Sequence, residues 1–260
     1  MASSVTHIAI ADKINNILGD GIIKNLPLFF GGNLAPDAVH AKQNYKRADK
    51  KRSHLCDGIR SYGYGYPETA ELFKNRVNEF IKNYYRTANE DKDLYFGYIV
   101  HLLADEFYLL SLFERLENHL KNSGINTDEP GFRKKLADEV NDDPSAYNEK
   151  YIKFFSETSQ ILDISAPDYD FKQNAVDVLE AVWDYEVKDY ISVNEINISK
   201  RWVINNFFKK EQAKKSDDRE QVMSFIDFAA NNIIMRLSCK DGIVKMLQGK
   251  GSAFALHQSD

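Results

Sequence analysis

Apolar residues recur along most of the chain at the spacing of amphipathic helices, whereas strand-like alternation is confined to few and short runs. Residues 4–18 can form a first helix, with Ser3 or Ser4 at its N-cap and Gly19 at its end. Further helices are expected over 68–86 and from the acidic residues at 90, 91 and 93 to about 121. Others are expected near 131–140, 145–161, 171–190, 199–214, 218–238 and 241–248. The pattern predicts an all-α protein, with residues 1–260 forming a single multi-helix domain.

Two of these helices show a clear inward face. In 68–86 and 218–238 the apolar positions follow helical spacing, and the residues expected inside are Leu72, Val77, Phe80 and Ile81, then Val222, Phe225, Ile226, Ala229, Ile233 and Leu237. Residues 19–36 are rich in glycine and proline and are expected to form a loop, with Pro36 opening a short helix that carries Asp37 and His40. The segment "SYGYGYPETA" is expected to be a second loop.

Composition is that of an ordinary soluble globular protein, with 260 residues, 43% hydrophobic and 28% charged. The net charge of −5 argues against a general nucleic-acid-binding surface. No run of about 18 apolar residues is found, so no membrane span is expected. The start "MASSVTHIAIADKINN" lacks the basic region of a secretory signal, and Cys56 and Cys239 suit a reducing compartment, so we expect a cytoplasmic protein.

The segment "GYIVHLLADEFYLL", residues 97–110, places His101 and Asp105 inside an apolar helix. Residues four apart lie on one helix face, so the two side chains can share a ligand. A buried carboxylate must be neutralised by a proton, a cation or a metal ion. A simple hydrogen bond between His101 and Asp105 inside a core is the alternative.

Other histidines and carboxylates extend this pair. Four of the six histidines fall within the first 101 residues, and imidazole together with carboxylate suits Zn²⁺ and similar divalent ions. The residues that can supply such a site come from four segments and are His7, Asp37, His54, His101 and Asp105.

The segments "THIAIADKI", "GNLAPDAVH", "RSHL" and "GYIVHLLADEF" occur in the order and approximate spacing found in the bacterial zinc-dependent phospholipase C family, which is related to zinc-dependent single-strand nucleases. The chain resembles that family over roughly residues 5–110. The resemblance implies its helical fold and one zinc ion held by Asp37, His54, His101 and Asp105. It also implies a second zinc ion held by His7 and a bridging Asp105, with Asp37 beside the attacking water as general base.

The chain departs from the family's trinuclear members after His101. These members use a further histidine and a later H-x-x-x-E helix, whereas here only His119 and His257 remain, and neither has a glutamate four residues later. The third metal site is therefore expected to be absent. In this interpretation residues 1–121 carry the metal site and residues 122–249 form supporting helices.

Neighbouring residues offer further candidates. His40 could hydrogen-bond to a metal ligand or be exposed. Six lysines and arginines between 42 and 52 could attract a phosphate, with Arg47 and Arg52 as candidates, or they could form a solvated charge run. The motifs of three rival classes are missing: His-Asp of phosphohydrolases, Glu-x-x-His of di-iron bundles, and His-Glu-x-x-His of metalloproteases.

The sequence thus predicts a hydrolase of phosphoric ester bonds that uses one or two zinc ions to activate water. Its substrate would be a small-molecule or lipid phosphoester, and the oligomeric state stays open. Two alternatives remain: the same fold and metal site acting on a different bond, and a non-catalytic metal-binding protein.

Overall fold

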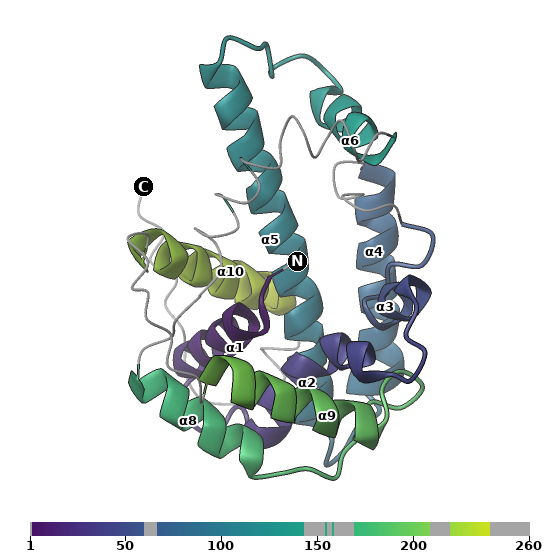
Figure 1. Ribbon diagram of the computed structural model, residues 1–260, viewed down its shortest axis with the longest axis vertical. Helices are drawn as coiled ribbons and strands as arrows, with labels where there is room; N and C mark the ends of the chain where they lie inside the picture. The colour runs from purple at the N-terminus through teal and green to yellow at the C-terminus, as the bar shows by residue number, and fades with distance from the viewer. Residues whose placement is uncertain are drawn as a thin grey trace.

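The computed structural model describes residues 2–59, 67–142, 154, 158, 169–208 and 219–239. Across these residues the regular structure is helical and contains no β-strand; Val187 and Ile191 form only an isolated bridge. The all-α prediction is confirmed (Figure 1). The α-helices are α1 (Ser4–Leu18), α2 (Leu26–Ala38), α3 (Arg47–Ser53), α4 (Pro67–Phe80), α5 (Lys92–Asn122), α6 (Phe132–Asp142), α8 (Tyr169–Glu180), α9 (Val193–Val203) and α10 (Arg219–Cys239). A 3₁₀ turn η1 (Val39–Ala41) and two π-helical turns, η3 (Ile81–Tyr85) and η4 (Ile204–Phe208), complete the described elements.

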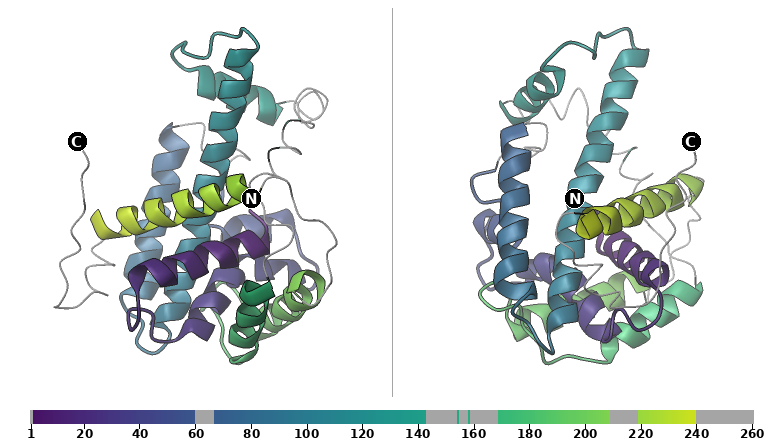
Figure 2. Two further views of the ribbon diagram at one scale, coloured as in Figure 1. Left: turned by 90° about the vertical axis from the view of Figure 1, so that its left-hand side faces the viewer. Right: turned by 180° about the vertical axis from the view of Figure 1, so that it is seen from behind.

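Helix α5 is the central element of the fold. It is 31 residues long and almost every residue from Asp93 to Ser111 is buried. Helix α2 packs along it, α1 and α10 pack together beside it, and η3 contacts it at the end of α4 (Figure 2). Although α5 is long and apolar enough to cross a membrane, 83% of its most apolar window is buried inside the protein, as in a core helix.

Helix α1 forms where the sequence predicts it. Ser3 is the N-cap, and its hydroxyl accepts a hydrogen bond from the Thr6 amide at 3.2 Å. Gly19 ends the helix with a φ of 77°, a conformation that glycine adopts without a side-chain penalty.

Helix α2 corrects the prediction of a loop over 19–36. The side chain of Asn25 caps it by accepting from the Leu28 amide at 3.1 Å, and Pro27 lies in its first turn, where no N–H is needed. Pro36 lies inside the last turn of this helix rather than at the start of a new one, and His40 lies in η1. Burial of nearly the whole segment outweighs its weak helix propensity.

Gly32 of α2 and Gly97 of α5 lie where the two helices touch. A Cβ atom built on Gly32 would lie 1.9 Å from the backbone carbonyl oxygen of Leu94, and one built on Gly97 would lie 1.9 Å from that of Phe29. The backbones of α2 and α5 therefore touch. The carboxylate of Asp93 secures the start of this contact by accepting from the amides of Lys24 and Asn25 at 2.9 and 2.6 Å.

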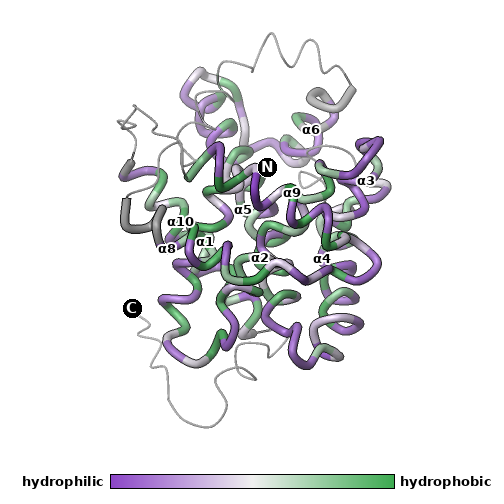
Figure 3. The backbone as a smooth tube through the Cα atoms, turned by 60° about the horizontal axis from the view of Figure 1, so that its bottom comes forward, coloured by the Kyte–Doolittle hydropathy of each residue, from purple (hydrophilic) through white to green (hydrophobic). Residues whose placement is uncertain are grey.

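The inward faces are partly as predicted. All six expected positions of α10 are buried, and so are Val77, Phe80 and Ile81. Leu72 is instead 40% exposed and Phe73 takes its place inside, because Phe73, Val77 and Phe80 share one helical face. In Figure 3 the backbone of α3 is coloured largely as hydrophilic, in keeping with its sequence RADKKRS.

Two helices in the second half have different bounds from those predicted. Helix α8 ends at Glu180 rather than near 190, because the aromatic rings of Trp183 and Tyr185 turn back to pack around Lys200 of α9. Helix α9 starts at Val193 rather than 199, where Ser192 and Glu195 form a capping box. The predicted helix 241–248 and most of the 61–70 loop and of helix 145–161 lie outside the described residues.

Candidate metal centre

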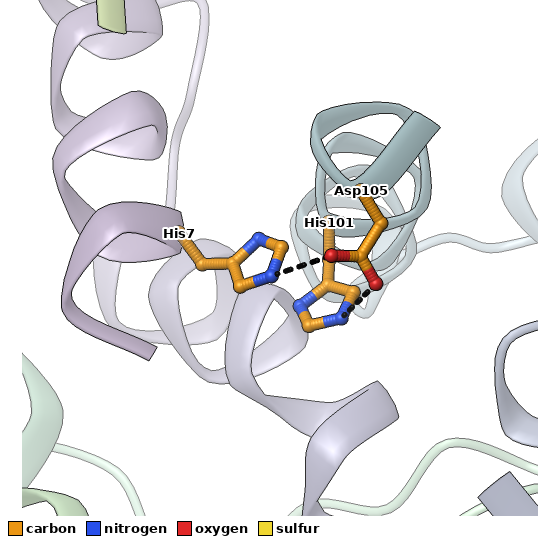
Figure 4. Close-up of side chains that lie close together, drawn as sticks. All are labelled: His7, His101 and Asp105. Carbon is orange, nitrogen blue, oxygen red and sulfur yellow. Dashed lines mark ion pairs between the residues drawn. The ribbon is translucent and has the colours of Figure 1, made fainter. Parts of the chain in front are cut away.

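Five predicted residues come together from four segments of the chain. His7 lies on α1, Asp37 in the last turn of α2, His54 directly after α3, and His101 and Asp105 one turn apart on α5. The rings of His7 and His101 stack with centroids 3.7 Å apart. Figure 4 shows the two rings next to each other and the Asp105 carboxylate beside both, with one oxygen directed at each ring.

One group of donor atoms lies around Nε2 of His54. The Nε2 atom of His54 lies 3.2 Å from Nε2 of His101, 3.4 Å from Oδ1 of Asp37 and 3.6 Å from Oδ2 of Asp105. Oδ2 of Asp105 lies 3.7 Å from Nε2 of His101. These four side chains are the set that the sequence resemblance assigns to one zinc ion.

A second group shares Asp105 with the first. Nε2 of His7 lies 3.3 Å from Oδ1 of Asp105, while Oδ2 of the same carboxylate faces His54 and His101. The amide of Ala2 donates to Oδ1 at 3.0 Å. Asp105 is therefore placed to bridge two positions, with one oxygen directed at each.

Hydrogen bonds fix which ring nitrogens face the centre. Nδ1 of His101 lies 2.7 Å from the carbonyl oxygen of Asn33, and Nδ1 of His54 lies 3.0 Å from that of Lys50. Because a carbonyl only accepts, each Nδ1 carries the proton. The remaining nitrogen of each ring, Nε2, faces the other ring at 3.2 Å and is the atom that can bind a metal ion placed between them.

Burial and mutual charge set the protonation of the cluster. Burial lowers the pKa of His101 well below its usual value and so favours the neutral ring that binds metals. Burial alone would raise the pKa values of Asp37 and Asp105, but the facing histidines outweigh it, helped at Asp37 by Lys50, and both pKa values are lowered. The neutral His101 imidazole and the ionised carboxylates of Asp37 and Asp105 are in the forms in which these groups bind zinc.

The spacing of these donors fits zinc. Tetrahedral coordination with Zn–N bonds of about 2.0–2.1 Å places neighbouring ligand atoms roughly 3.3 Å apart. The donor pairs given above are 3.2 to 3.7 Å apart in the first group and 3.3 Å apart in the second. The ligand atoms of Asp37, His54 and His101 all lie within 4.8 Å of one another, and so do those of His7, His101 and Asp105. Nε2 of His7 and Oδ2 of Asp105 are buried without a hydrogen-bond partner, and a metal ion at this position would supply one for both.

Several supporting residues were not found from the sequence. The Ser53 hydroxyl lies 3.0 Å from Nδ1 of His54 and 2.9 Å from the carbonyl oxygen of Pro36, which links α3 to the end of α2. The buried Tyr98 hydroxyl donates to the Ser53 carbonyl. Such contacts orient metal ligands, and they depend on tertiary structure that a motif does not encode.

The remaining candidates lie at the edge of the cluster or away from it. Nε2 of His40 is 3.8 Å from Oδ1 of Asp37, and the His40 side chain is 46% exposed. Arg52 donates to the Asp189 carbonyl at 3.1 Å, and Arg47 is exposed at the start of α3. The basic side chain that reaches Asp37 is instead Lys50, at 3.0 Å.

Comparison with known proteins identifies the family. The family model described as zinc dependent phospholipase C matches residues 6–157, which include the five clustered residues. No curated protein and no solved structure matches the chain. The family match covers more than half of the chain and agrees with the helical fold and the donor set. The chain therefore belongs to the zinc-dependent phospholipase C family.

Proposed function

We propose that the protein is a zinc-dependent hydrolase that cleaves phosphodiester bonds with an activated water molecule. The observation that carries the proposal is the convergence of three imidazoles and two carboxylates at zinc-like spacing. Membership of the zinc-dependent phospholipase C family supports a phosphoric ester as the bond that is cleaved.

Each side chain has a distinct part in this proposal. Asp37, His54, His101 and Asp105 would hold one zinc ion, and His7 with the second oxygen of Asp105 would hold another. When bound, zinc lowers the pKa of a coordinated water toward 7 and polarises a phosphoryl oxygen. The carbonyl partners of His54 and His101 keep the two rings in the tautomer that leaves Nε2 available.

Asp37 is the residue we assign to handling the proton of the attacking water. Its side chain is 17% exposed, whereas His7 and His101 are fully buried and His54 and Asp105 nearly so. Water therefore reaches the cluster at the Asp37 side. The lowered pKa of Asp37 keeps the carboxylate ionised, so it can accept a hydrogen bond from this water and orient it for attack on phosphorus.

A non-catalytic metal-binding role is the alternative that one observation favours. Because four of the five donors are nearly inaccessible, the cluster resembles a closed structural site more than an open one. The two roles differ in whether a coordinated water can exchange with solvent.

The decisive measurement is metal content by inductively coupled plasma mass spectrometry, on protein purified without chelator. We expect about one or two zinc ions per chain, lost in Asp105→Ala and retained in His119→Ala, because His119 lies near the far end of α5 from the cluster. Far-ultraviolet circular dichroism shows whether the variants remain helical. Absence of zinc from the folded wild-type protein would contradict the proposal.

Catalysis is then tested with bis(p-nitrophenyl) phosphate. We expect turnover that is abolished by chelation and restored by added zinc. A protein that holds zinc but cleaves no phosphodiester would support the metal-binding alternative.

A further inference from the structure

Lys50 places a cation at the open side of the candidate metal centre. Its Nζ atom lies 3.0 Å from Oδ1 of Asp37 and 3.1 Å from Nε2 of His40. Since an ammonium group has no lone pair, Lys50 donates both hydrogen bonds and His40 accepts one of them. Lys50 is thus held in a fixed position by two partners, in contrast to a freely solvated lysine.

The exposed fraction of the side chains increases from the buried histidines of the cluster through Asp37 and Lys50 to His40. His7 and His101 are fully buried, Asp37 is 17% exposed, Lys50 is 24% exposed and His40 is 46% exposed. Among the described residues, a ligand that approaches the buried donors from the Asp37 side therefore meets Lys50 and His40 first.

The positive charge of Lys50 is not needed to balance the Asp37 carboxylate once a metal ion is bound there. Oδ1 of Asp37, the oxygen that Lys50 contacts, also lies 3.4 Å from Nε2 of His54 and belongs to the donor group. Once that oxygen binds a divalent ion, two cations share one carboxylate. A third N–H of the ammonium has no partner among the described residues, so it is available to an anion that enters the site.

We propose that Lys50 binds a non-bridging oxygen of the substrate phosphoryl group, while His40 holds the ammonium in place. This inference rests on the proposed phosphodiesterase function and deepens it, because it assigns a protein cation to recognition of the anionic phosphate. A lysine acts on phosphate as a point charge on a long stem, and its hydrogen bond to an anionic oxygen is stronger than one between neutral groups.

The test compares phosphate binding by four zinc-loaded proteins: wild type, Lys50→Gln, Lys50→Arg and Lys51→Gln. Lys51 is the matched control, since it lies on α3 with the same charge but about 100° further round the helix. Zinc content is measured on each sample at saturating zinc, and the Kd for inorganic phosphate is then measured by isothermal titration calorimetry.

We expect Lys50→Gln to retain zinc and to weaken phosphate binding by about tenfold or more, the range for a hydrogen bond to a charged group. Lys50→Arg, which keeps the charge, should remain within about threefold of wild type, and Lys51→Gln should not differ from it.

Three results would overturn the role of Lys50. These are an unchanged phosphate Kd in zinc-loaded Lys50→Gln, a loss of zinc from this variant that saturating zinc does not restore, and zinc-loaded wild type that binds no phosphate. In the second case Lys50 would act only by supporting Asp37. Failure of the wild-type protein to bind zinc is a different result, which rejects the proposed function itself.

Discussion

Gly97→Ala tests whether the metal centre depends on the backbone contact between α2 and α5. Alanine is the better helix former, by about 0.8–1.0 kcal/mol, so on propensity alone this substitution in the middle of α5 would stabilise the protein. The structure predicts the opposite sign. The added Cβ would lie 1.9 Å from the carbonyl oxygen of Phe29 and 2.8 Å from the amide nitrogen of Asn33, and both atoms belong to the backbone of α2.

The size of the effect follows from how far the helices must separate. Ordinary contact requires more than 3 Å, so α2 must move by more than 1 Å relative to α5. Overpacking of this kind typically costs about 1–3 kcal/mol, and the rigid backbone places Gly97 at the upper end of that range. After subtraction of the gain in helix propensity, we expect a net loss of about 2 kcal/mol and a Tm lower by about 4–8 °C.

The same displacement should remove the metal. Asp37 reaches the centre from α2 and His101 from α5, and zinc sites tolerate ligand distance errors of about 0.2 Å. We therefore expect Gly97→Ala to lose zinc. Gly31→Ala is the control, because its Cβ would meet only the far end of the Tyr185 side chain, at 2.0 Å from the hydroxyl oxygen.

Differential scanning calorimetry and metal analysis on the two variants separate these expectations. Gly31→Ala should lose less stability than Gly97→Ala and should keep zinc, since the loop that carries Tyr185 can adjust. A Gly97→Ala protein that matches wild type in Tm and zinc content would refute the inference that backbone contact between α2 and α5 sets the spacing of the donors.

Three further predictions concern the buried lysine, the support of His54 and the metal itself. Burial lowers the pKa of Lys200 to about 8, against about 10.4 in an unfolded chain. Between these pH values Lys200 keeps its proton in the unfolded chain but releases it in the folded protein. The free energy of unfolding, measured with urea, should therefore rise with pH by up to about 1.4 kcal/mol per pH unit. The Lys200→Met variant should lose this pH dependence. Tyr98→Phe removes the donor to the Ser53 carbonyl beside His54. It should weaken zinc affinity by about 10- to 100-fold, measured in competition with a chelator. Unchanged affinity would mean that Tyr98 only fills space. Zinc at 100 times its Kd should stabilise the protein by about 2.7 kcal/mol, read as a Tm increase that magnesium does not reproduce.

The parts of this structure that the sequence predicted are those set by local chemistry. The cap at Ser3 and the stop at Gly19 act within a few residues of the helix ends. The four-residue spacing of His101 and Asp105 on an apolar helix places both side chains on one face, whatever surrounds them. These features need no knowledge of the rest of the fold.

The parts that the sequence did not predict depend on contacts between distant segments. Gly31 and Gly32 were interpreted as loop residues and Pro36 as the start of a new helix, yet all three lie in α2, where α5 and Tyr185 pack closely against the two glycines. A capping box at Ser192 and Glu195 was a local signal that could have placed the start of α9. In the sequence Lys50 is one of several basic residues, and only the structure shows that its side chain contacts Asp37.

The part of the chain beyond the family match still acts on the centre through packing. Helix α9 contacts α2 and η1, the elements that carry Asp37 and His40, and α10 contacts α1 and α5. Lys200 joins α9 to the loop after α8 by donating to the Val182 carbonyl, with its ammonium 4.2 Å from the Trp183 ring. A shift of α9 would therefore be passed to η1, which carries His40, and to α2, which carries Asp37. Changes in this second half of the chain can therefore alter both the position of Asp37 in the cluster and the partner that His40 provides for Lys50.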